Sequence, residues 1–587
     1  MSSCREGRET ARAFEVWAPT ARTAQVEVGG KRMPMVRDDG GWWRAALPEA
    51  GAEVEYRFVL DGGAPLPDPR SPSQPLGVHG PSRLVDHNVF RWSDQRWQAG
   101  PLAAAVIYEL HIGTFTPEGT FDAAIGRLDH LVDLGITHLE LMPVAEFPGL
   151  RGWGYDGVDL YAPHHGYGGP EGLKRLVDAC HARGLAVLLD VVYNHLGPAG
   201  NYLARFGPYF TDRYRTPWGE AVNLDGADSN EVRRFFCDNA LMWLRDYRMD
   251  GLRIDATHAL FDQSAMPFLE QLAAEVDALG ARHGRRLVLI VESDLNDPRA
   301  VRPRAVGGYG LDALWNEDFH HALHAVLTGE RTGYYADFGA LGDVATALHE
   351  GFVYGARYSA YRRRHHGRPA VGLDGDRFVG FLQNHDQVGN RARGERLSQL
   401  MSPGRLMIGA ALVLTSPFVP MLFHGEEWGA RTPFQYFTDH EDAALGRAVS
   451  DGRRREFAAF GEKVEDVPDP QAPETFYRSK LDWGELGREP HSGVLDWYRR
   501  LIRLRLSHTE LSDGRLDVLR ALFNEKEHWL RVDRGPFTIA CNLSAAPRAL
   551  PLAPNRPRCV VLASEPDIAV AAETVELPPE SVAILGP

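Results

Sequence analysis

Residues 249–258 read Met-Asp-Gly-Leu-Arg-Ile-Asp-Ala-Thr-His, a short apolar segment that becomes polar at its end. Leu252 and Ile254 alternate with Arg253 and Asp255, which is the period of two that a β-strand requires. Arg253 and Asp255 therefore point to the same side, where the cation lowers the pKa of the carboxyl and keeps it ionised. We interpret Asp255 as a candidate nucleophile. A structural ion pair at a strand end would produce the same local pattern.

Seven further apolar segments surround this one, and amphipathic helices alternate with them. The predicted strands are 106–111, 136–144, 186–192, 287–292, 313–315, 378–382 and 419–423, and the clearest helices are 121–134, 170–183, 232–247 and 268–279. No glycine-rich dinucleotide fingerprint follows any of these strands. Eight strands in a strand–helix rhythm predict an α/β fold, a (β/α)8 TIM barrel.

Short alternating β-type segments lie on both sides of the predicted barrel. We expect an N-terminal β-sandwich of the carbohydrate-binding type over residues 1–91, and an antiparallel all-β domain over 507–587. The catalytic barrel then spans 92–506. This length exceeds an ordinary barrel, so we expect loop insertions, notably at 194–230 and 329–376.

Composition narrows the classes of partner. The chain has 587 residues and a formal net charge of -15, which disfavours nucleic acid and anionic membranes and is compatible with a neutral substrate. The five cysteines are scattered without metal-ligand spacing, so neither a disulfide framework nor a zinc site is expected. The sequence has no signal-peptide pattern and no segment of transmembrane length. We expect a cytoplasmic protein.

Three acids lie at the ends of three of the predicted strands: Asp255, Glu292 and Asp386. Catalytic groups of such barrels sit at the carboxyl ends of the strands, so these acids should converge on one cavity. Like charges raise one another's pKa, and a carboxyl that stays protonated near neutrality can act as a general acid. Two carboxyls about 5 to 5.5 Å apart would form a retaining glycosidase pair. A divalent metal site that also uses His195, His258 and His385 is the competing interpretation.

Four motifs resemble the conserved regions of glycoside hydrolase family 13, the α-amylase family. They are Asp190-Val191-Val192-Tyr193-Asn194-His195, Gly251-Leu252-Arg253-Ile254-Asp255, Glu292-Ser293-Asp294 and Asn384-His385-Asp386, in the order of the family and on the expected strands. The resemblance implies Asp255 as the nucleophile, Glu292 as the general acid/base and Asp386 as the acid that stabilises the transition state. It also implies that Arg253 supports the nucleophile, that His195 and His385 bind the sugar, and that Tyr155 stacks beneath it. Asp190 and Asn194 are expected as structural support.

The sequence between these motifs is similar to one group within the family. The segments are 65–82, 147–168, 292–297, 315–322, 383–390 and 434–440. Members of this group cleave the α-1,4 bond next to the terminal trehalose of maltooligosyltrehalose, after a synthase has made that terminal linkage. The resemblance thus implies maltooligosyltrehalose and related α-1,4-glucans as substrates and the synthase as a pathway partner. A 1,4-α-glucan branching enzyme remains the alternative. Glucan transfer differs from hydrolysis in which acceptor reaches the glycosyl-enzyme, and the motifs do not encode water access or acceptor grooves. A non-catalytic glucan-binding protein is a more distant one.

Further substrate contacts are expected next to the predicted strand ends. Asn316, Glu317, Asp318, His320 and His321 are a candidate lip on the trehalose side, with a solvated loop and capping residues as the alternative. Thr257, His258, Gln387 and Asn390 follow the acids closely and are expected to line the same groove, unless they serve hydrogen bonds of the core. Asn194 resembles a calcium-binding asparagine of some α-amylases, but no complementary aspartate cluster accompanies it. We expect no metal and no cofactor.

Overall fold

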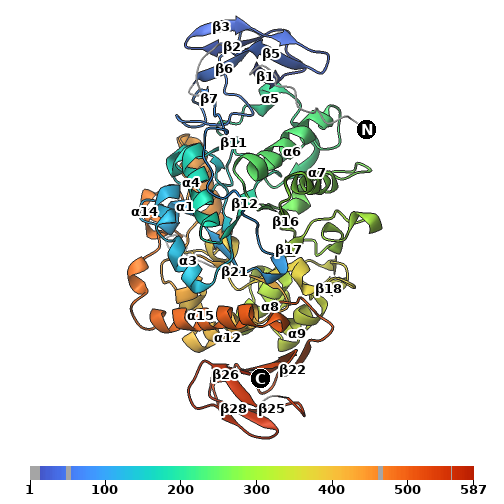
Figure 1. Ribbon diagram of the computed structural model, residues 1–587, viewed down its shortest axis with the longest axis vertical. Coiled ribbons are helices and arrows are strands. Elements are labelled where there is room, and N and C mark those ends of the chain that lie inside the picture. The colour runs from blue at the N-terminus through green and yellow to red at the C-terminus, as the bar shows by residue number, and fades with distance from the viewer. Residues whose placement is uncertain (1–12, 48–53, 460–466, 557) are drawn as a thin grey trace.

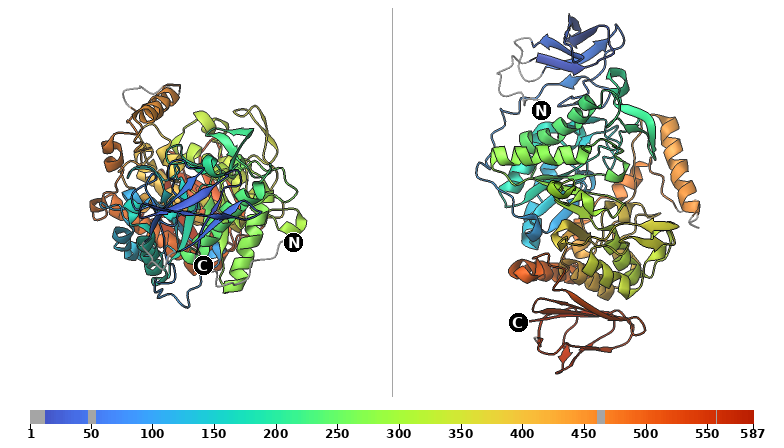
Figure 2. Two further views of the ribbon diagram at one scale, coloured as in Figure 1. Left: turned by 90° about the horizontal axis from the view of Figure 1, so that it is seen from above. Right: turned by 90° about the vertical axis from the view of Figure 1, so that its right-hand side faces the viewer.

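The computed structural model describes residues 13–47, 54–459, 467–556 and 558–587. The described chain is elongated, with a small β unit at one end, a large α/β body in the middle and a second β unit at the other end (Figure 1). The view from above in Figure 2 shows these parts stacked along one axis.

Eight parallel strands close into a barrel in the order β8, β9, β12, β15, β16, β17, β20, β21. Their bounds are β8 (Ile107–Leu110), β9 (His138–Leu141), β12 (Ala186–Val191), β15 (Gly251–Ile254), β16 (Val288–Val291), β17 (Ala313–Trp315), β20 (Phe378–Phe381) and β21 (Val419–Phe423). Every residue of these strands is buried, as expected for a parallel sheet that is covered on both faces. The predicted (β/α)8 fold is confirmed.

Helices surround the barrel as the apolar periodicity predicts. The main ones are α4 (Gly169–His181), α6 (Ser229–Asp246), α7 (Phe268–His283), α8 (Glu317–Thr328), α9 (Leu341–Glu350), α12 (Pro403–Leu414), α13 (Ala443–Ala459) and α15 (His491–Ser507). The single helix predicted over 121–134 is two helices, α2 (Phe121–Ile125) and α3 (Leu128–Leu134). Gly126 caps the first, and its weak helix propensity explains the break.

The N-terminal unit is a sandwich of two antiparallel sheets. Its strands are β1 (Ala13–Trp17), β2 (Ala24–Val28), β3 (Lys31–Pro34), β4 (Val36–Arg37), β5 (Trp42–Ala46), β6 (Glu55–Leu60) and β7 (Ser82–Arg83), in the orders β1-β5-β4 and β3-β2-β6-β7. Phe14 of the first sheet packs on Tyr56 of the second with ring centroids 4.8 Å apart. The alternating pattern of these strands therefore buries one face of each sheet.

The C-terminal unit also has two antiparallel sheets, in the orders β22-β23-β24-β29-β26 and β25-β28-β27. The strands are β22 (Arg520–Asn524), β23 (Trp529–Arg534), β24 (Phe537–Asn542), β25 (Arg548–Pro551), β26 (Cys559–Ala563), β27 (Ala569–Val570), β28 (Thr574–Leu577) and β29 (Ser581–Gly586). Because α15 ends at Ser507, we propose that this domain begins directly after that helix.

Both expected insertions carry structure of their own. Residues 194–230 include the hairpin of β13 (Phe210–Thr216) and β14 (Gly219–Val222), and residues 329–376 include α9 and the hairpin of β18 (Arg357–Ser359) and β19 (Arg364–His366). Among the described cysteines, Cys180, Cys237 and Cys541 are buried free thiols and Cys559 is exposed, while Cys4 lies outside the described residues. None of the helices in the described ranges combines the length and the apolar character that a membrane crossing needs.

We predict that Gly251→Ala destabilises the barrel. A methyl group at this position would meet Val288 O at 2.5 Å and Leu188 Cδ2 at 2.9 Å, so the strand β15 would have to shift. Overpacking of this kind costs about 1–3 kcal/mol. Calorimetry should show a lower unfolding temperature for Gly251→Ala than for Gly100→Ala, because a Cβ at Gly100 meets no atom within 4 Å. Equal unfolding temperatures would contradict the prediction.

Candidate active site

A cavity of about 520 Å³ opens beside the carboxyl ends of the barrel strands. Such a volume is within the range of small-ligand pockets. The lining residues are Trp153, Tyr155, Asp156, His195, Trp218, Asp255, Ala256, His258, Glu292, His385, Asp386, Asn390, Tyr436, Phe437, Val449 and Arg453. The three predicted acids therefore meet in one cavity, together with the predicted Tyr155, His195, His258, His385 and Asn390.

Arg253 on β15 joins three carboxyl groups from three neighbouring strands. Its Nη1 lies 2.6 Å from Asp190 Oδ2 and 2.8 Å from Asp255 Oδ1, and its Nη2 lies 2.7 Å from Glu292 Oε2. The parallel register pairs Asp190 with Arg253 across β12 and β15, which places these groups at one level of the barrel. The arginine side chain is fully buried, and its guanidinium lies 4.2 Å from the centroid of Trp315. Charge-assisted bonds in this dry environment hold the acids in one geometry.

Two donors bind the same carboxyl oxygen of Glu292. Besides Arg253, the backbone N–H of Ala256 donates to Glu292 Oε2 at 2.9 Å. Ala256 has a left-handed backbone (φ 37°), which costs strain energy in a non-glycine residue and aims this N–H. Burial and the charge of Asp255 raise the pKa of Glu292 against the opposing effect of Arg253. A protonated Glu292 is thereby favoured beside the cavity.

His385 belongs to a second buried network that reaches the same acids. Its Nδ1 donates to Glu109 Oε1 at 2.5 Å, and its backbone N–H donates to Glu109 Oε2 at 2.9 Å. Its Nε2 lies 2.7 Å from the hydroxyl of Tyr155, which donates to Asp190 Oδ2 at 2.6 Å. Burial opposes the imidazolium, but Glu109 and Asp386 raise the pKa of His385 to about 9. His385 is therefore a cation at neutral pH, with both ring nitrogens donating.

Asn194 and His195 support the opposite side of the site. Asn194 Nδ2 donates to Asp255 Oδ2 at 3.0 Å, and Asn194 Oδ1 accepts from His195 Nδ1 at 2.6 Å. Burial lowers the pKa of His195 to about 4, so the ring is neutral at pH 7. Trp218, which is half exposed on the insertion hairpin, stacks on this ring at 4.3 Å. Protein partners therefore bind both polar atoms of the Asn194 amide.

Asn390 bonds the third acid, Asp386, and Gln387 bonds a further carboxyl, that of Glu317. Asn390 Nδ2 donates to Asp386 Oδ1 at 3.2 Å, and Gln387 Nε2 donates to Glu317 Oε2 at 2.7 Å. Burial and the neighbouring charges of Glu292 and Asp386 raise the pKa of Glu317 well above its ordinary value. The Glu317 carboxyl is therefore near enough to Glu292 and Asp386 to feel their charges.

The structure corrects the expected lip at 316–321. Asn316 is the N-cap of α8 and accepts from Phe319 N at 3.1 Å, whereas Asp318 accepts from Asn296 Nδ2 at 2.9 Å and from Tyr354 N at 2.7 Å. His320 stacks on Phe381, and His321 is buried among aromatic rings. These four side chains lie in the interior because the segment starts a helix and does not form an open loop; of the expected lip, Glu317 is near enough to two of the three acids to feel their charges.

Thr257 also serves the framework. Its hydroxyl donates to the carbonyl oxygen of Glu292 at 2.7 Å, and its N–H donates to the same oxygen at 2.9 Å. Both bonds tie the end of β15 to the end of β16. Thr257 therefore positions the Glu292 backbone. Of the two roles expected for Thr257, groove lining and core hydrogen bonding, these bonds support the second.

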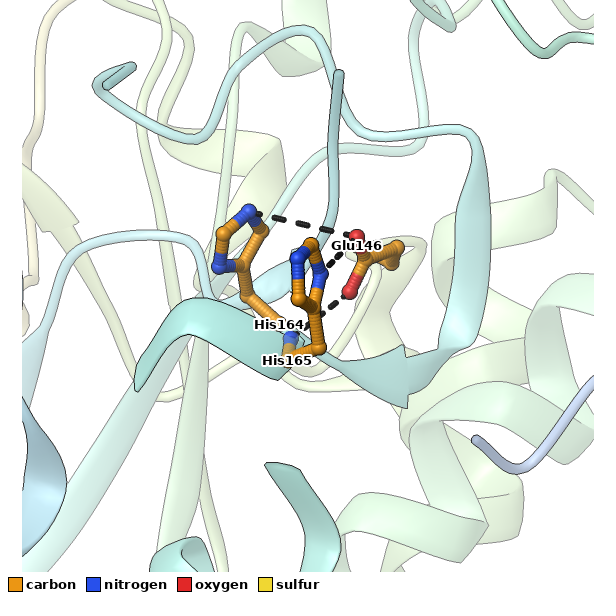
Figure 3. Close-up of side chains that lie close together, drawn as sticks. All are labelled: Glu146, His164 and His165. Carbon is orange, nitrogen blue, oxygen red and sulfur yellow. Dashed lines mark hydrogen bonds and ion pairs between the residues drawn. The ribbon is translucent and has the colours of Figure 1, made fainter. Parts of the chain in front are cut away.

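Glu146, His164 and His165 bring potential metal ligands within 4.8 Å of one another (Figure 3). Each of these ligand atoms already has a hydrogen-bond partner. His165 Nδ1 donates to Glu146 Oε1 at 2.7 Å, while His164 Nε2 donates to Gly149 O at 3.1 Å and His164 Nδ1 accepts from Gly166 N at 3.1 Å. The cluster thus fastens the loop that carries Trp153 and Tyr155, and its atoms are satisfied without an ion.

Comparison with known families agrees with the barrel. The model described as "Alpha amylase, catalytic domain" matches residues 85–215, and a domain of unknown function, DUF3459, matches 514–584. A crystal structure named "Putative alpha Amylase from Salmonella typhimurium" superposes with a TM-score of 0.90 at 39% identity and covers 98% of this chain and 97% of that one. The fold and the comparisons thus define a glycosidase of the α-amylase class, glycoside hydrolase family 13.

Relatives of known name narrow the class further. The malto-oligosyltrehalose trehalohydrolase of Rhizobium sp. (strain M-11) is 50% identical over 582 residues, which cover 97% of each chain. The protein of the same name from Arthrobacter ramosus is 52% identical and covers 92% of this chain and 94% of its own. A 1,4-alpha-glucan branching enzyme of Pseudoalteromonas atlantica is 28% identical, over 85% of this chain and 66% of its own. The chain belongs to the malto-oligosyltrehalose trehalohydrolase family.

We predict that Glu109→Gln lowers the pKa of His385. In the folded protein this pKa is about 9 against an ordinary 6.5, so the stability that the ion pair contributes is complete below about pH 6.5 and is lost as the pH rises through about 9. Without the carboxylate, burial prevails and the ring loses its proton at lower pH. Titration of ¹⁵N-labelled histidine by NMR, with His385→Asn to assign the signal, would check this. An unchanged pKa in the variant would refute it.

Proposed function

We propose that this protein is a retaining glycoside hydrolase that cleaves the α-1,4 bond next to the terminal trehalose of maltooligosyltrehalose and releases trehalose. The observation that carries the chemistry is the bridge from Arg253 to Asp255 and Glu292 in the wall of one cavity. The names of the relatives support the choice of substrate, because they cover nearly the whole chain at about half identity.

In the first step, Asp255 attacks the anomeric carbon on the non-trehalose side of the scissile bond. Arg253 Nη1 and Asn194 Nδ2 each bind one oxygen of this carboxylate, which keeps it oriented. Glu292 gives its proton to the glycosidic oxygen as the bond breaks, and trehalose leaves. The raised pKa of Glu292 suits this role, since the acid must hold a proton at working pH.

In the second step, Glu292 takes a proton from water while the water oxygen attacks the glycosyl–Asp255 ester. Two inversions return the α configuration at the new reducing end. Asp386 stabilises the oxocarbenium-like sugar. His385, whose two ring nitrogens bond Glu109 and Tyr155, holds Tyr155 in place beside that sugar. His195 and Tyr155 bind the same sugar, and the half-exposed Trp218 offers a stacking surface to a sugar farther along the cavity.

We further propose that the substrate comes from a synthase that converts the reducing end of a maltooligosaccharide into the trehalose linkage. This partner is required by the chemistry, because an α-1,4-glucan alone has no trehalose end. The predicted cytoplasmic location would place both enzymes beside stored glucan.

We predict that Asp255→Asn and Glu292→Gln each reduce kcat by at least about 10³-fold. One change removes the nucleophile and the other removes the transferable proton, and general acid–base catalysis alone contributes about 10²–10⁴-fold. Single-turnover and steady-state rates on maltopentaosyl-trehalose would measure the loss, with circular dichroism to show an intact fold. A variant that keeps a near-normal rate would remove its residue from the proposed role.

We predict that maltopentaosyl-trehalose yields free trehalose and maltopentaose, with little action on amylose. Chromatography identifies the products, and early NMR spectra should show the α-anomer at the new reducing end. New α-1,6 branches in amylose without trehalose release would favour a branching enzyme. An initial β-anomer would exclude double displacement, and the absence of any turnover would leave a glucan-binding protein.

A further inference from the structure

We propose that Arg453 is a positioning residue that locks the turn carrying His385 and Asp386. Arg453 lies on α13, nearly seventy positions after Asp386 in the sequence, yet its side chain lines the same cavity. The right-hand view of Figure 2 shows α13 as an orange helix along the side of the barrel. The inference rests on the proposed function, since it assigns a support to one of its three acids.

The turn is the short helix α10 (His385–Gly389), whose two ends are held differently. At its start, Asn384 of the same motif accepts from Gln387 N at 2.7 Å. At its end, Arg453 Nη2 donates to the carbonyl oxygen of Gly389 at 2.6 Å. A five-residue helix has few internal hydrogen bonds, so a guanidinium bound to its last carbonyl contributes a large part of the bonding that stabilises its C-terminal end.

Arg453 also determines which way the Asn390 amide faces. Its Nη1 donates to Asn390 Oδ1 at 3.3 Å, and Asn390 Nδ2 then donates to Asp386 Oδ1 at 3.2 Å. A guanidinium is a donor only, so it keeps Oδ1 on its own side and turns the NH₂ toward the carboxylate. The reversed amide would place an oxygen against Asp386, which would repel the charge that the transition state needs.

Packing leaves Arg453 and the turn little freedom to separate. A Cβ on Gly389 would overlap the ring of Trp153, so the end of α10 lies directly against that indole. On the other side the guanidinium lies 5.2 Å from the ring centroid of Tyr436 and 4.7 Å from that of Phe457. The turn is therefore clamped between Trp153 and Arg453.

The test is a double-mutant cycle on the full chain with maltopentaosyl-trehalose. Arg453→Met should lower kcat about tenfold, which equals about 1.4 kcal/mol, and change KM less than about twofold. Asn390→Leu should have a similar effect, and the double variant should be no slower than the slower single variant, because both act through Asp386. Arg453→Lys should recover part of the rate. Arg455→Met, an exposed arginine of the same helix, is the matched control and should leave kcat unchanged.

Three results would overturn the proposal. The first is a kcat for Arg453→Met equal to that of Arg455→Met. The second is a rise in KM with unchanged kcat, which would mean that Arg453 contacts the substrate directly. The third is that the losses of the two single variants add in the double variant. If the wild type releases no trehalose, the proposed function fails by itself. Hydrogen exchange of peptide 384–391 then decides the positioning role: faster exchange in Arg453→Met supports it, and equal exchange rejects it.

Discussion

The active site depends on one buried guanidinium that faces three carboxyl groups. Arg253 bonds Asp190, Asp255 and Glu292 with its two terminal nitrogens, while one positive charge cannot neutralise three negative ones. The excess negative charge favours protonated carboxyls. Burial together with the charge of Asp255 raises the pKa of Asp190 to about 7 and also raises the pKa of Glu292. Removing the cation would leave buried carboxyls unpaired, at a cost on the order of 3–5 kcal/mol. Arg253 is therefore required to stabilise the three buried carboxyl groups.

The second cation, His385, completes the electrostatic balance from the other side of the barrel. An unbroken chain of hydrogen bonds runs from Glu109 through His385 and Tyr155 to Asp190 and Arg253. Its members come from five different parts of the barrel, so their geometry exists only after the barrel has closed. Such a network resists reorientation, because each group would leave a buried partner unsatisfied. A rigid arrangement of this kind can meet a developing positive charge without reorganising.

Prediction from the sequence located residues correctly where their position depends on the end of a strand. Asp255, Glu292 and Asp386 follow apolar strands, and parallel strands all end at one rim, so their meeting in one cavity could be foreseen. It was wrong at Asn316, Asp318, His320 and His321, which also follow a strand. There the chain enters a helix at once, and the polar side chains are used for its cap and for the contacts behind it. It missed Trp218, because insertion hairpins carry no periodic signal that points to a cavity.

The sequence by itself determined the barrel, the two β units and the strand-end acids, since apolar periodicity and strand polarity are local properties of the chain. Only the tertiary structure decided which groups touch. Glu109 reaches His385 across more than 270 positions, and α13 lies over the turn of Asp386 from a remote segment. The rise in the pKa of Glu292 likewise depends on the folded structure. Burial and the summed field of neighbouring charges set a pKa, and both exist only when distant strands are packed together.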